Sequence, residues 1–292
     1  MGNDPPDASS KHQDLPNRLA DAQSLAREVL TEDGPRDITS ELVGTSGAGS
    51  AVVRSREQCR AACLDYATEV ASQAGCHVRW SVAEGDSVLR DGELGNLEGP
   101  IAAILRAERP MLNLLQRACG IATATHRFVD AVAGTRCRVL HTRKTAPRLR
   151  VFDVAAVLAG GGHVHRLGLD RVVMIKDNHW TALGTMGVDL GRAIEEARQR
   201  GVSAVQVEVE STAQVEAACQ SGADRLLIDN RVPDEFHELA DLARQIAPGI
   251  EIEATGGITL DNVRAYAEAG ADYVSIGALT HSVQAVDLTL EM

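Results

Sequence analysis

Hydrophobic residues recur with two different spacings along this 292-residue chain, and the change falls near Gly134. In the first part, leucine and alanine residues three or four positions apart predict a helix that Gly34 and Pro35 end. Short apolar runs and glycine-rich turns follow, as in short strands joined by tight turns. The expected elements of this part are a helix over 15–30, strands at 51–53 and 78–80, a helix over 57–74, glycine-rich turns over 84–105 and a long helix over 111–132.

From residue 138 onwards, short apolar runs alternate with amphipathic segments. Alternation of this kind predicts an α/β fold with parallel strands and helices packed outside them. A complete eight-unit barrel takes about 250 residues, whereas this part has roughly six units in about 150 residues, so we expect an incomplete, open, TIM-like α/β barrel. The expected strands are 138–140, 172–175, 204–209, 226–228, 250–252 and 273–276, and the expected helices are 154–159, 190–199, 213–221, 234–246 and 260–269.

Composition and charge argue against two classes of protein. The chain has 29 Lys and Arg residues against 41 Asp and Glu residues, which gives a net charge of −12. This charge repels nucleic acid, so no nucleic-acid partner is expected. No run reaches the roughly 18 consecutive apolar residues of a membrane helix, and the polar start lacks the apolar segment of a signal peptide. We therefore expect a cytoplasmic protein without a membrane partner, and a disordered tail over 1–14.

Six cysteines are scattered along the chain, without the density of a disulfide scaffold. Cys59, Cys63 and Cys76 lie close enough in sequence to raise the question of a zinc site. Their spacing fits no paired-cysteine zinc finger, and the surrounding alanine-rich sequence resembles a helix. We therefore interpret them as buried free thiols.

Polar or glycine residues follow nearly every expected strand of the second part. In α/β barrels the active site lies at the carboxyl ends of the strands, so these residues define an expected active face. Its basic members are Arg143, Lys144, His165, Arg166 and Lys176. In an acidic protein this concentration of positive charge predicts a ligand with several negative groups, because arginine binds carboxylate or phosphate through paired hydrogen bonds. Salt bridges to surface acids are the alternative interpretation.

Two acids and a glycine-rich end complete this face. Glu208 and Asp229 lie at the ends of two neighbouring expected strands. Carboxylates among phosphate-binding cations indicate a divalent metal, sugar hydroxyls or a developing carbocation. Residues 255–257 (TGG) and Gly277 follow the last two strands, where barrels often bind phosphate through backbone N–H groups. A phosphorylated substrate is therefore expected.

Seven ordered motifs of the second part resemble those of the quinolinate phosphoribosyltransferase family. They are 141–147 (HTRKTAP), 160–166 (GGGHVHR), 176–179 (KDNH), 208–211 (EVES), 227–230 (LIDN), 254–257 (ATGG) and 277–281 (GALTH). The resemblance extends upstream and covers residues 15 to 292, with further matches at 120–123 (GIAT), 112–113 (LN), 108–109 (ER) and 37–40 (DITS). Because the motifs are long, ordered and numerous, the match is specific.

The resemblance implies an N-terminal α/β open sandwich domain over 15–118, rejoined by 280–292, and an open barrel over 119–279 that carries the active site. It also implies a homodimer, or an assembly of dimers, in which one subunit helps to close the active site of the other. The implied reaction joins quinolinate to phosphoribosyl pyrophosphate with Mg²⁺ as cofactor. Its products are nicotinate mononucleotide, pyrophosphate and carbon dioxide, and it serves de novo NAD synthesis.

The resemblance also assigns residues to the aromatic acceptor. Arg143, His165 and Arg166 match family positions that hold the quinolinate carboxylates. Arg109 matches an arginine that is contributed across the dimer. These residues orient the ring by its two carboxylates.

Other positions match the groups that handle phosphoribosyl pyrophosphate. Lys144 and Lys176 match catalytic lysines near the substrate and the pyrophosphate, and Glu208 and Asp229 match catalytic acids near the ribose and Mg²⁺. The positions that match the 5′-phosphate end are Thr255, Gly256, Gly257, Gly277 and His281.

Four positions depart from the family pattern. Val154 stands in a helix that lacks the usual Lys-Tyr pair, and Val164 stands where asparagine is usual. Arg148 and Arg36 each replace a common glycine. None of these removes a residue assigned to catalysis. Val154 and Val164 flank the substrate loop, however, so a related phosphoribosyltransferase acting on another aromatic carboxylate stays open.

Two further classes compete with this interpretation. A barrel aldolase would use Lys144 or Lys176 as a Schiff base and needs a lysine with a depressed pKa. The acid Asp177 beside Lys176 instead favours a charged lysine. A non-catalytic ligand-binding protein has little support, because both acids and all the basic residues are present together.

Overall fold

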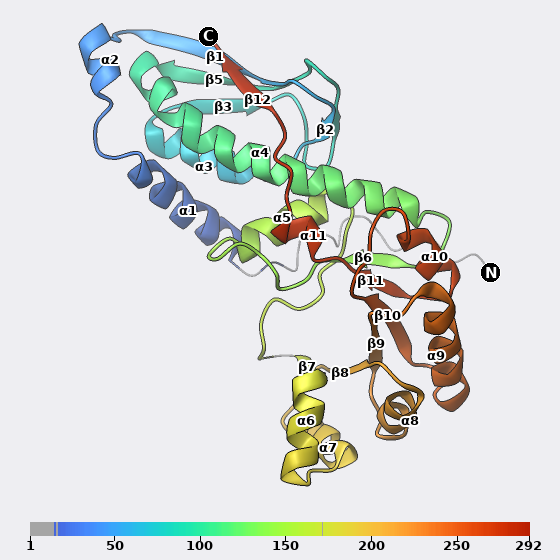
Figure 1. Cartoon of the computed structure of the whole chain (residues 1–292). Coiled ribbons are helices and arrows are strands. Elements are labelled where there is room, and N and C mark those ends of the chain that lie inside the picture. Colours follow the sequence, from blue (N-terminus) through green and yellow to red (C-terminus); the bar gives the residue numbers. More distant parts are fainter. Residues whose placement is uncertain (1–14, 16, 171) are drawn as a thin grey trace, which may run out of the picture. The chain divides into compact units, whose positions relative to one another are not determined.

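The chain divides into two compact units, whose elements are labelled in Figure 1. The structure, a computed structural model, describes Leu15 and residues 17–170 and 172–292. The first unit comprises the described residues up to His126 together with Thr145–Gly162 and Ala278–Met292. The second comprises Arg127–Lys144 and His163–Gly277. The tail expected over 1–14 lies outside the described residues.

These units differ in three segments from the division expected from the sequence. By contacts, residues 119–126, Thr145–Gly162 and residues 278–279 group with the first unit, although they lie inside the range 119–279 expected for the barrel. The chain thus leaves the second unit after Lys144 and re-enters it at His163. The boundaries expected from the sequence stay a prediction.

An antiparallel sheet of four strands, in the order β12-β1-β5-β3, forms the framework of the first unit. Its members are β1 (Ala48–Ser55), β3 (His77–Trp80), β5 (Glu93–Pro100) and β12 (Leu288–Glu291). The last strand of the chain pairs with the first, with Val52 opposite Glu291. A separate two-stranded ribbon consists of β2 (Cys59–Arg60) and β4 (Ser87–Val88).

Helices pack around this sheet and bury the core of the first unit. They are α1 (Arg18–Glu32), α2 (Ile38–Val43), α3 (Leu64–Ala74), α5 (Arg150–Ala159), α11 (Ala278–His281) and most of α4 (Ile101–Ala131). The helix α1 buries Ala22, Leu25 and Leu30, as the periodicity predicts. Tyr66 of α3 and Phe152 of α5 are both fully buried and meet edge to face, with 4.9 Å between ring centroids. These contacts stabilise the unit by removing large aromatic surfaces from water.

Two helix predictions in this unit are wrong at their beginnings. The helix expected over 57–74 starts only at Leu64, because β2 precedes it and Cys63 adopts a left-handed conformation with φ 56°. The long helix expected from residue 111 begins at Ile101 and includes Pro110. A proline inside a helix removes one hydrogen bond and costs about 3 kcal/mol. Complete burial of Ile104 and Met111 on either side of it offsets that cost.

Arg148, one of the departures from the family pattern, also has a left-handed backbone, with φ 69°. Glycine adopts this conformation without strain, which accounts for glycine being common at the position. Here the arginine side chain forms contacts that offset the strain. Its guanidinium donates to Asp21, Ser24 and Glu28 of α1 at 2.8, 3.0 and 2.9 Å.

A sheet of six parallel strands, in the order β6-β11-β10-β9-β8-β7, forms the second unit. Its members are β6 (Arg138–Leu140), β7 (Val172–Ile175), β8 (Ala204–Val209), β9 (Arg225–Asp229), β10 (Glu251–Thr255) and β11 (Tyr273–Ser275). In the described ranges no ladder joins β6 to β7, and only an isolated bridge links Leu140 to His163. The expected α/β fold with a parallel sheet is therefore confirmed, and the sheet is open between its first two strands.

Helices alternate with these strands along the chain. They are α6 (Asp177–Met186), α7 (Leu190–Gln199), α8 (Thr212–Gln220), α9 (Pro233–Ile246) and α10 (Val263–Glu268). Figure 1 shows α7, α8, α9 and α10 following one another beside the sheet. The helix α6 was not expected from the sequence, because none of its residues is buried and no apolar stripe marks it. No helix in the described part of the chain is long and apolar enough to cross a lipid bilayer.

Candidate active site

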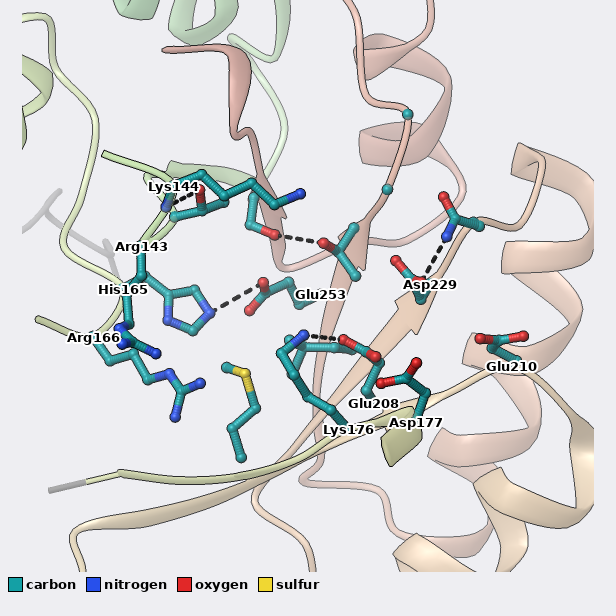
Figure 2. A pocket seen from close by; sticks show the side chains of 18 residues that line it. Arg143, Lys144, His165, Arg166, Lys176, Asp177, Glu208, Glu210, Asp229 and Glu253 are labelled. Atoms are coloured by element: carbon teal, nitrogen blue, oxygen red, sulfur yellow. Dashed lines mark hydrogen bonds and ion pairs between the residues drawn. The ribbon is translucent and has the colours of Figure 1, made fainter. Parts of the chain in front are cut away.

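A cavity of about 540 Å³ lies at the carboxyl ends of the parallel strands. Parallel strands all end at the same side of a sheet, which brings together side chains far apart in the sequence. Every residue that lines the cavity belongs to the second unit. Figure 2 shows Arg143, His165 and Arg166 on one side of it and Glu208 and Asp229 on the other. The cavity therefore presents a cationic wall opposite an anionic one.

Two arginines of the cationic wall repel each other in a half-buried setting. Burial lowers the pKa of Arg166, the charge of Arg143 lowers it further, and Glu253 opposes both effects. The Nε atom of Arg143 is buried and has no hydrogen-bond partner among the described residues. A ligand with carboxylate or phosphate groups would supply that partner and neutralise the repulsion. The wall is thus suited to an anion.

His165 stands beside these arginines and is held by a buried acid. Its Nε2 atom lies 3.2 Å from Oε1 of Glu253, and the two side chains are 6% and 0% exposed. Burial would raise the pKa of Glu253, but the charge and hydrogen bond of His165 and the charge of Arg225 outweigh it, so the pKa is lowered. This acid of the cavity lining therefore stays ionised.

In the anionic wall the pKa of Asp229 is raised, whereas that of Glu253 is lowered. Burial raises the pKa of Asp229, and the neighbouring charge of Glu208 raises it further, whereas Lys176 opposes both. The Lys176 ammonium donates to Oε2 of Glu208, and Trp180 of α6 donates to the Glu208 carbonyl at 2.8 Å. The helix missed from the sequence thus helps to position Glu208. A further cation beside Asp229 would stabilise its ionised form.

Asp229 ends β9, and the tight turn that follows the adjacent strand β10 holds it in position. Asn230 has a left-handed backbone with φ 52°, and its side chain donates to Asp229 Oδ2 at 2.6 Å. Gly256, with φ 80°, packs directly on this amide, so that a Cβ there would lie 2.2 Å from Asn230 Oδ1. Glycine at this position is required both by the backbone conformation and by the close approach.

Most of the site residues expected from the sequence line the cavity. They are Arg143, Lys144, His165, Arg166, Lys176, Glu208, Asp229, Thr255, Gly256 and Gly257. The others lie elsewhere: Gly277 ends the second unit, while Arg109 lies on α4 and His281 on α11, both exposed and both in the first unit.

Several residues of the cavity were missed by sequence reasoning. Thr142, Met174, Ser275 and Glu253 all line it. A signal existed only for Glu253, which directly follows the strand expected over 250–252. A parallel sheet is covered on both faces, so a glutamate within it needs a partner. The departures Val154 and Val164 do not line the cavity, and Val154 is fully buried in α5.

Metal ligands do not cluster in the described residues. No group of three or more His, Cys, Asp or Glu side chains among them has the arrangement of a metal site. All six cysteines are free and buried.

Comparison with known proteins gives a consistent result. The family model "Quinolinate phosphoribosyl transferase, C-terminal domain" matches residues 121–291, and the corresponding N-terminal model matches residues 37–119. Nicotinate-nucleotide pyrophosphorylase [carboxylating] of Homo sapiens is 35% identical over 92% of this chain and 91% of its own. The protein of that name from Mycobacterium leprae is 37% identical over 93% of this chain and 97% of its own.

A solved structure extends the similarity to the fold. Nicotinate-nucleotide pyrophosphorylase from Francisella tularensis superposes with a TM-score of 0.87 at 30% sequence identity, covering 94% of this chain and 96% of that one. Together, the two family models span most of the chain. The chain therefore belongs to the quinolinate phosphoribosyltransferase family.

Proposed function

We propose that this enzyme transfers the phosphoribosyl group of phosphoribosyl pyrophosphate to quinolinate, with loss of carbon dioxide, in NAD synthesis. The products are nicotinate mononucleotide and pyrophosphate. The observation that carries the proposal is one cavity in which Arg143, His165 and Arg166 face Glu208 and Asp229. The first wall suits the two carboxylates of quinolinate, and the second suits the positive charge that develops on the ribose. Relatives named for this activity support it.

The cationic wall orients the acceptor. Arg143 and Arg166 bind the carboxylates through charge-assisted hydrogen bonds and relieve their mutual repulsion. Fixed in this way, the ring nitrogen is directed at C1 of the ribose, and orientation alone supplies a large part of the rate enhancement. After the nitrogen bonds to C1, the positively charged ring stabilises the carbanion left when carbon dioxide departs.

The anionic wall acts on the ribose. As pyrophosphate leaves, C1 gains positive charge, which the carboxylates of Glu208 and Asp229 stabilise through space. Lys176, already paired with Glu208, holds that carboxylate in place and offers its ammonium to the pyrophosphate oxygens. Lys144, on the loop after β6, contributes a second ammonium. Thr255, Gly256 and Gly257 offer the hydroxyl and backbone N–H groups that suit the 5′-phosphate.

The residues of the anionic wall fit Mg²⁺. This ion is usually held by one or two carboxylates together with substrate phosphates, which matches Glu208 and Asp229 without a larger ligand cluster. The raised pKa of Asp229 marks a place where added positive charge is favourable. When bound, Mg²⁺ neutralises charge on the departing pyrophosphate.

We propose further that the enzyme works in the cytoplasm as a homodimer, and that Arg109 of one subunit and His281 serve the substrate. The family resemblance of 108–109 and 277–281 supports these roles. Arg109 is exposed on α4 and is not used within the cavity described above.

The test is release of carbon dioxide and pyrophosphate from phosphoribosyl pyrophosphate and Mg²⁺, with quinolinate or nicotinate as acceptor. We expect both products in equal amounts with quinolinate. Arg143→Ala should lower kcat/KM for quinolinate by about 100-fold, because a charge-assisted pair of hydrogen bonds is lost. Arg138→Ala, at the opposite end of β6, is the matched control and should retain activity. Turnover of nicotinate alone, or of neither acceptor, contradicts the proposal.

A further inference from the structure

Glu253 is a buried acid that the reaction described above does not use. It lies on β10 and is fully buried. Burial would raise its pKa, but His165 and Arg225 outweigh this effect and lower the pKa, so the carboxylate is ionised at neutral pH. A buried charge is retained only where it is paired and hydrogen-bonded. Its partners therefore indicate what it does.

The two oxygens of the Glu253 carboxylate have different partners, His165 on the cavity side and Arg225 on the other. Oε1 lies 3.2 Å from His165 Nε2, and Oε2 accepts from Arg225 Nη1 at 3.2 Å. Arg225 is held on its other side by Glu251, at 2.9 Å, and by the ring of Tyr273, at 3.8 Å from its centroid. Because the arginine is anchored, Glu253 has a defined position, and the dashed line in Figure 2 joins it to the imidazole.

This position determines which nitrogen of His165 carries hydrogen. An ionised carboxylate only accepts hydrogen bonds, so Nε2 must be protonated. In the neutral ring the lone pair then lies on Nδ1. His165 lines the cavity, and with Nε2 engaged by Glu253, Nδ1 is the nitrogen left for a ligand. A carboxylate can bind at Nδ1 only when that atom is protonated as well.

We propose that Glu253 is a positioning residue that fixes the Nε2–H form of His165 and thereby makes binding of an acceptor carboxylate depend on protonation of the ring. The identity of the acceptor rests on the proposed function, whereas the tautomer of His165 does not. Affinity for the acceptor should therefore fall as the pH rises and the ring loses its second proton.

The other charged groups of the cavity do not produce the same pH dependence. They are Arg143, Lys144, Arg166, Lys176, Asp177, Glu208, Glu210 and Asp229. A change of charge on an acid of the anionic wall would alter the affinity for phosphoribosyl pyrophosphate, which is measured separately. Loss of acceptor affinity with rising pH, with the affinity for phosphoribosyl pyrophosphate unaffected, would therefore come from His165.

Glu253→Gln tests the proposal because it keeps the shape and removes the charge. Arg225 can only donate, so it takes the amide oxygen, and the amide NH₂ faces His165. Nε2 must then accept, and the neutral ring carries its hydrogen on Nδ1, ready for a carboxylate. We expect KM for quinolinate to rise about tenfold between pH 6 and 8.5 in the wild type and to change less than about twofold in E253Q.

Glu251→Gln is the matched control, since Glu251 lies on the same strand and bonds the same Arg225 without touching His165. It should keep the wild-type pH profile. Imidazole ¹⁵N chemical shifts, measured without substrate and assigned with a His165→Gln variant, should show the Nε2–H form in the wild type and the Nδ1–H form in E253Q.

An Nδ1–H ring in the wild type, or a wild-type pH profile in folded E253Q, overturns the proposal. Should E253Q fail to fold in urea-unfolding measurements, the tautomer of the wild type decides by itself. Should the wild type fail to turn over quinolinate, the proposed function fails, and the same spectra still decide the role of Glu253.

Discussion

Replacing Gly256 with alanine should show whether close packing at the end of β10 positions Asp229. Two effects are combined at this residue. Its φ of 80° lies in the left-handed region, and an added Cβ would meet Asn230 Oδ1 at 2.2 Å and Asp229 Oδ1 at 2.7 Å. Its neighbour Gly257 has the same kind of backbone, with φ 61°, but a Cβ there would meet nothing within 4 Å. Gly257→Ala is therefore the matched control, because it adds the same backbone strain to the same turn without the contact with Asn230.

The expected magnitudes differ between the two variants. A left-handed conformation costs an alanine about 1–2 kcal/mol, so both variants should lose that much stability. In Gly256→Ala the Asn230 amide must also retreat by about 0.8 Å to restore a separation of 3.0 Å. The amide donates to Asp229, so the carboxylate moves with it. A displacement of about 1 Å in an active site can cost about 100-fold in rate.

Urea unfolding and steady-state release of pyrophosphate are the two measurements. We expect a similar loss of stability in both variants, a fall of about 100-fold in kcat for Gly256→Ala, and a fall of less than about fivefold for Gly257→Ala. Equal kcat values in the two variants would refute the reasoning, because the clash would then have no effect on Asp229.

Three further results are expected. Asp229→Asn should lower kcat by about 100-fold, through loss of a charge that stabilises the transition state. The same variant should also raise the urea midpoint at pH 7. The pKa of Asp229 is raised in the folded protein, so its ionised form destabilises the fold above that pKa. A lowered midpoint would contradict this reasoning. Arg117→Ala should cost about 3–5 kcal/mol of unfolding free energy by leaving the buried Asp153 without its ion pair, and a loss below 1 kcal/mol in urea titrations would disprove it. Mixing inactive Arg109→Ala and Lys144→Ala subunits in equal amounts should restore roughly a quarter of the wild-type activity, because about half of the dimers are then hybrids and each hybrid has one intact site. No recovery after confirmed subunit exchange would argue against a shared site.

The elements of the second unit could be predicted closely because their signals are local. Each strand is a short apolar run and most helices carry an apolar stripe, so all six strands and most helices are found near their expected positions. The rule that parallel strands end on one side of a sheet then placed Lys176, Glu208 and Asp229 together without any knowledge of the tertiary structure. The helix α6, which buries no residue, gave no such signal.

Other features of the protein depend on contacts between residues distant in the sequence, and only the tertiary structure decided them. Pairing of β1 with β12 joins two segments far apart in the sequence, and no local pattern specifies that register. The links from His165 to Glu253 and from Asn230 to Gly256 likewise join residues separated in sequence. Periodicity reports which face of an element is buried, whereas the partner of a buried charge and the space beside a glycine are set by packing. The sequence by itself therefore determined the residue types of the active face, and packing determined the protonation and position of the groups on it.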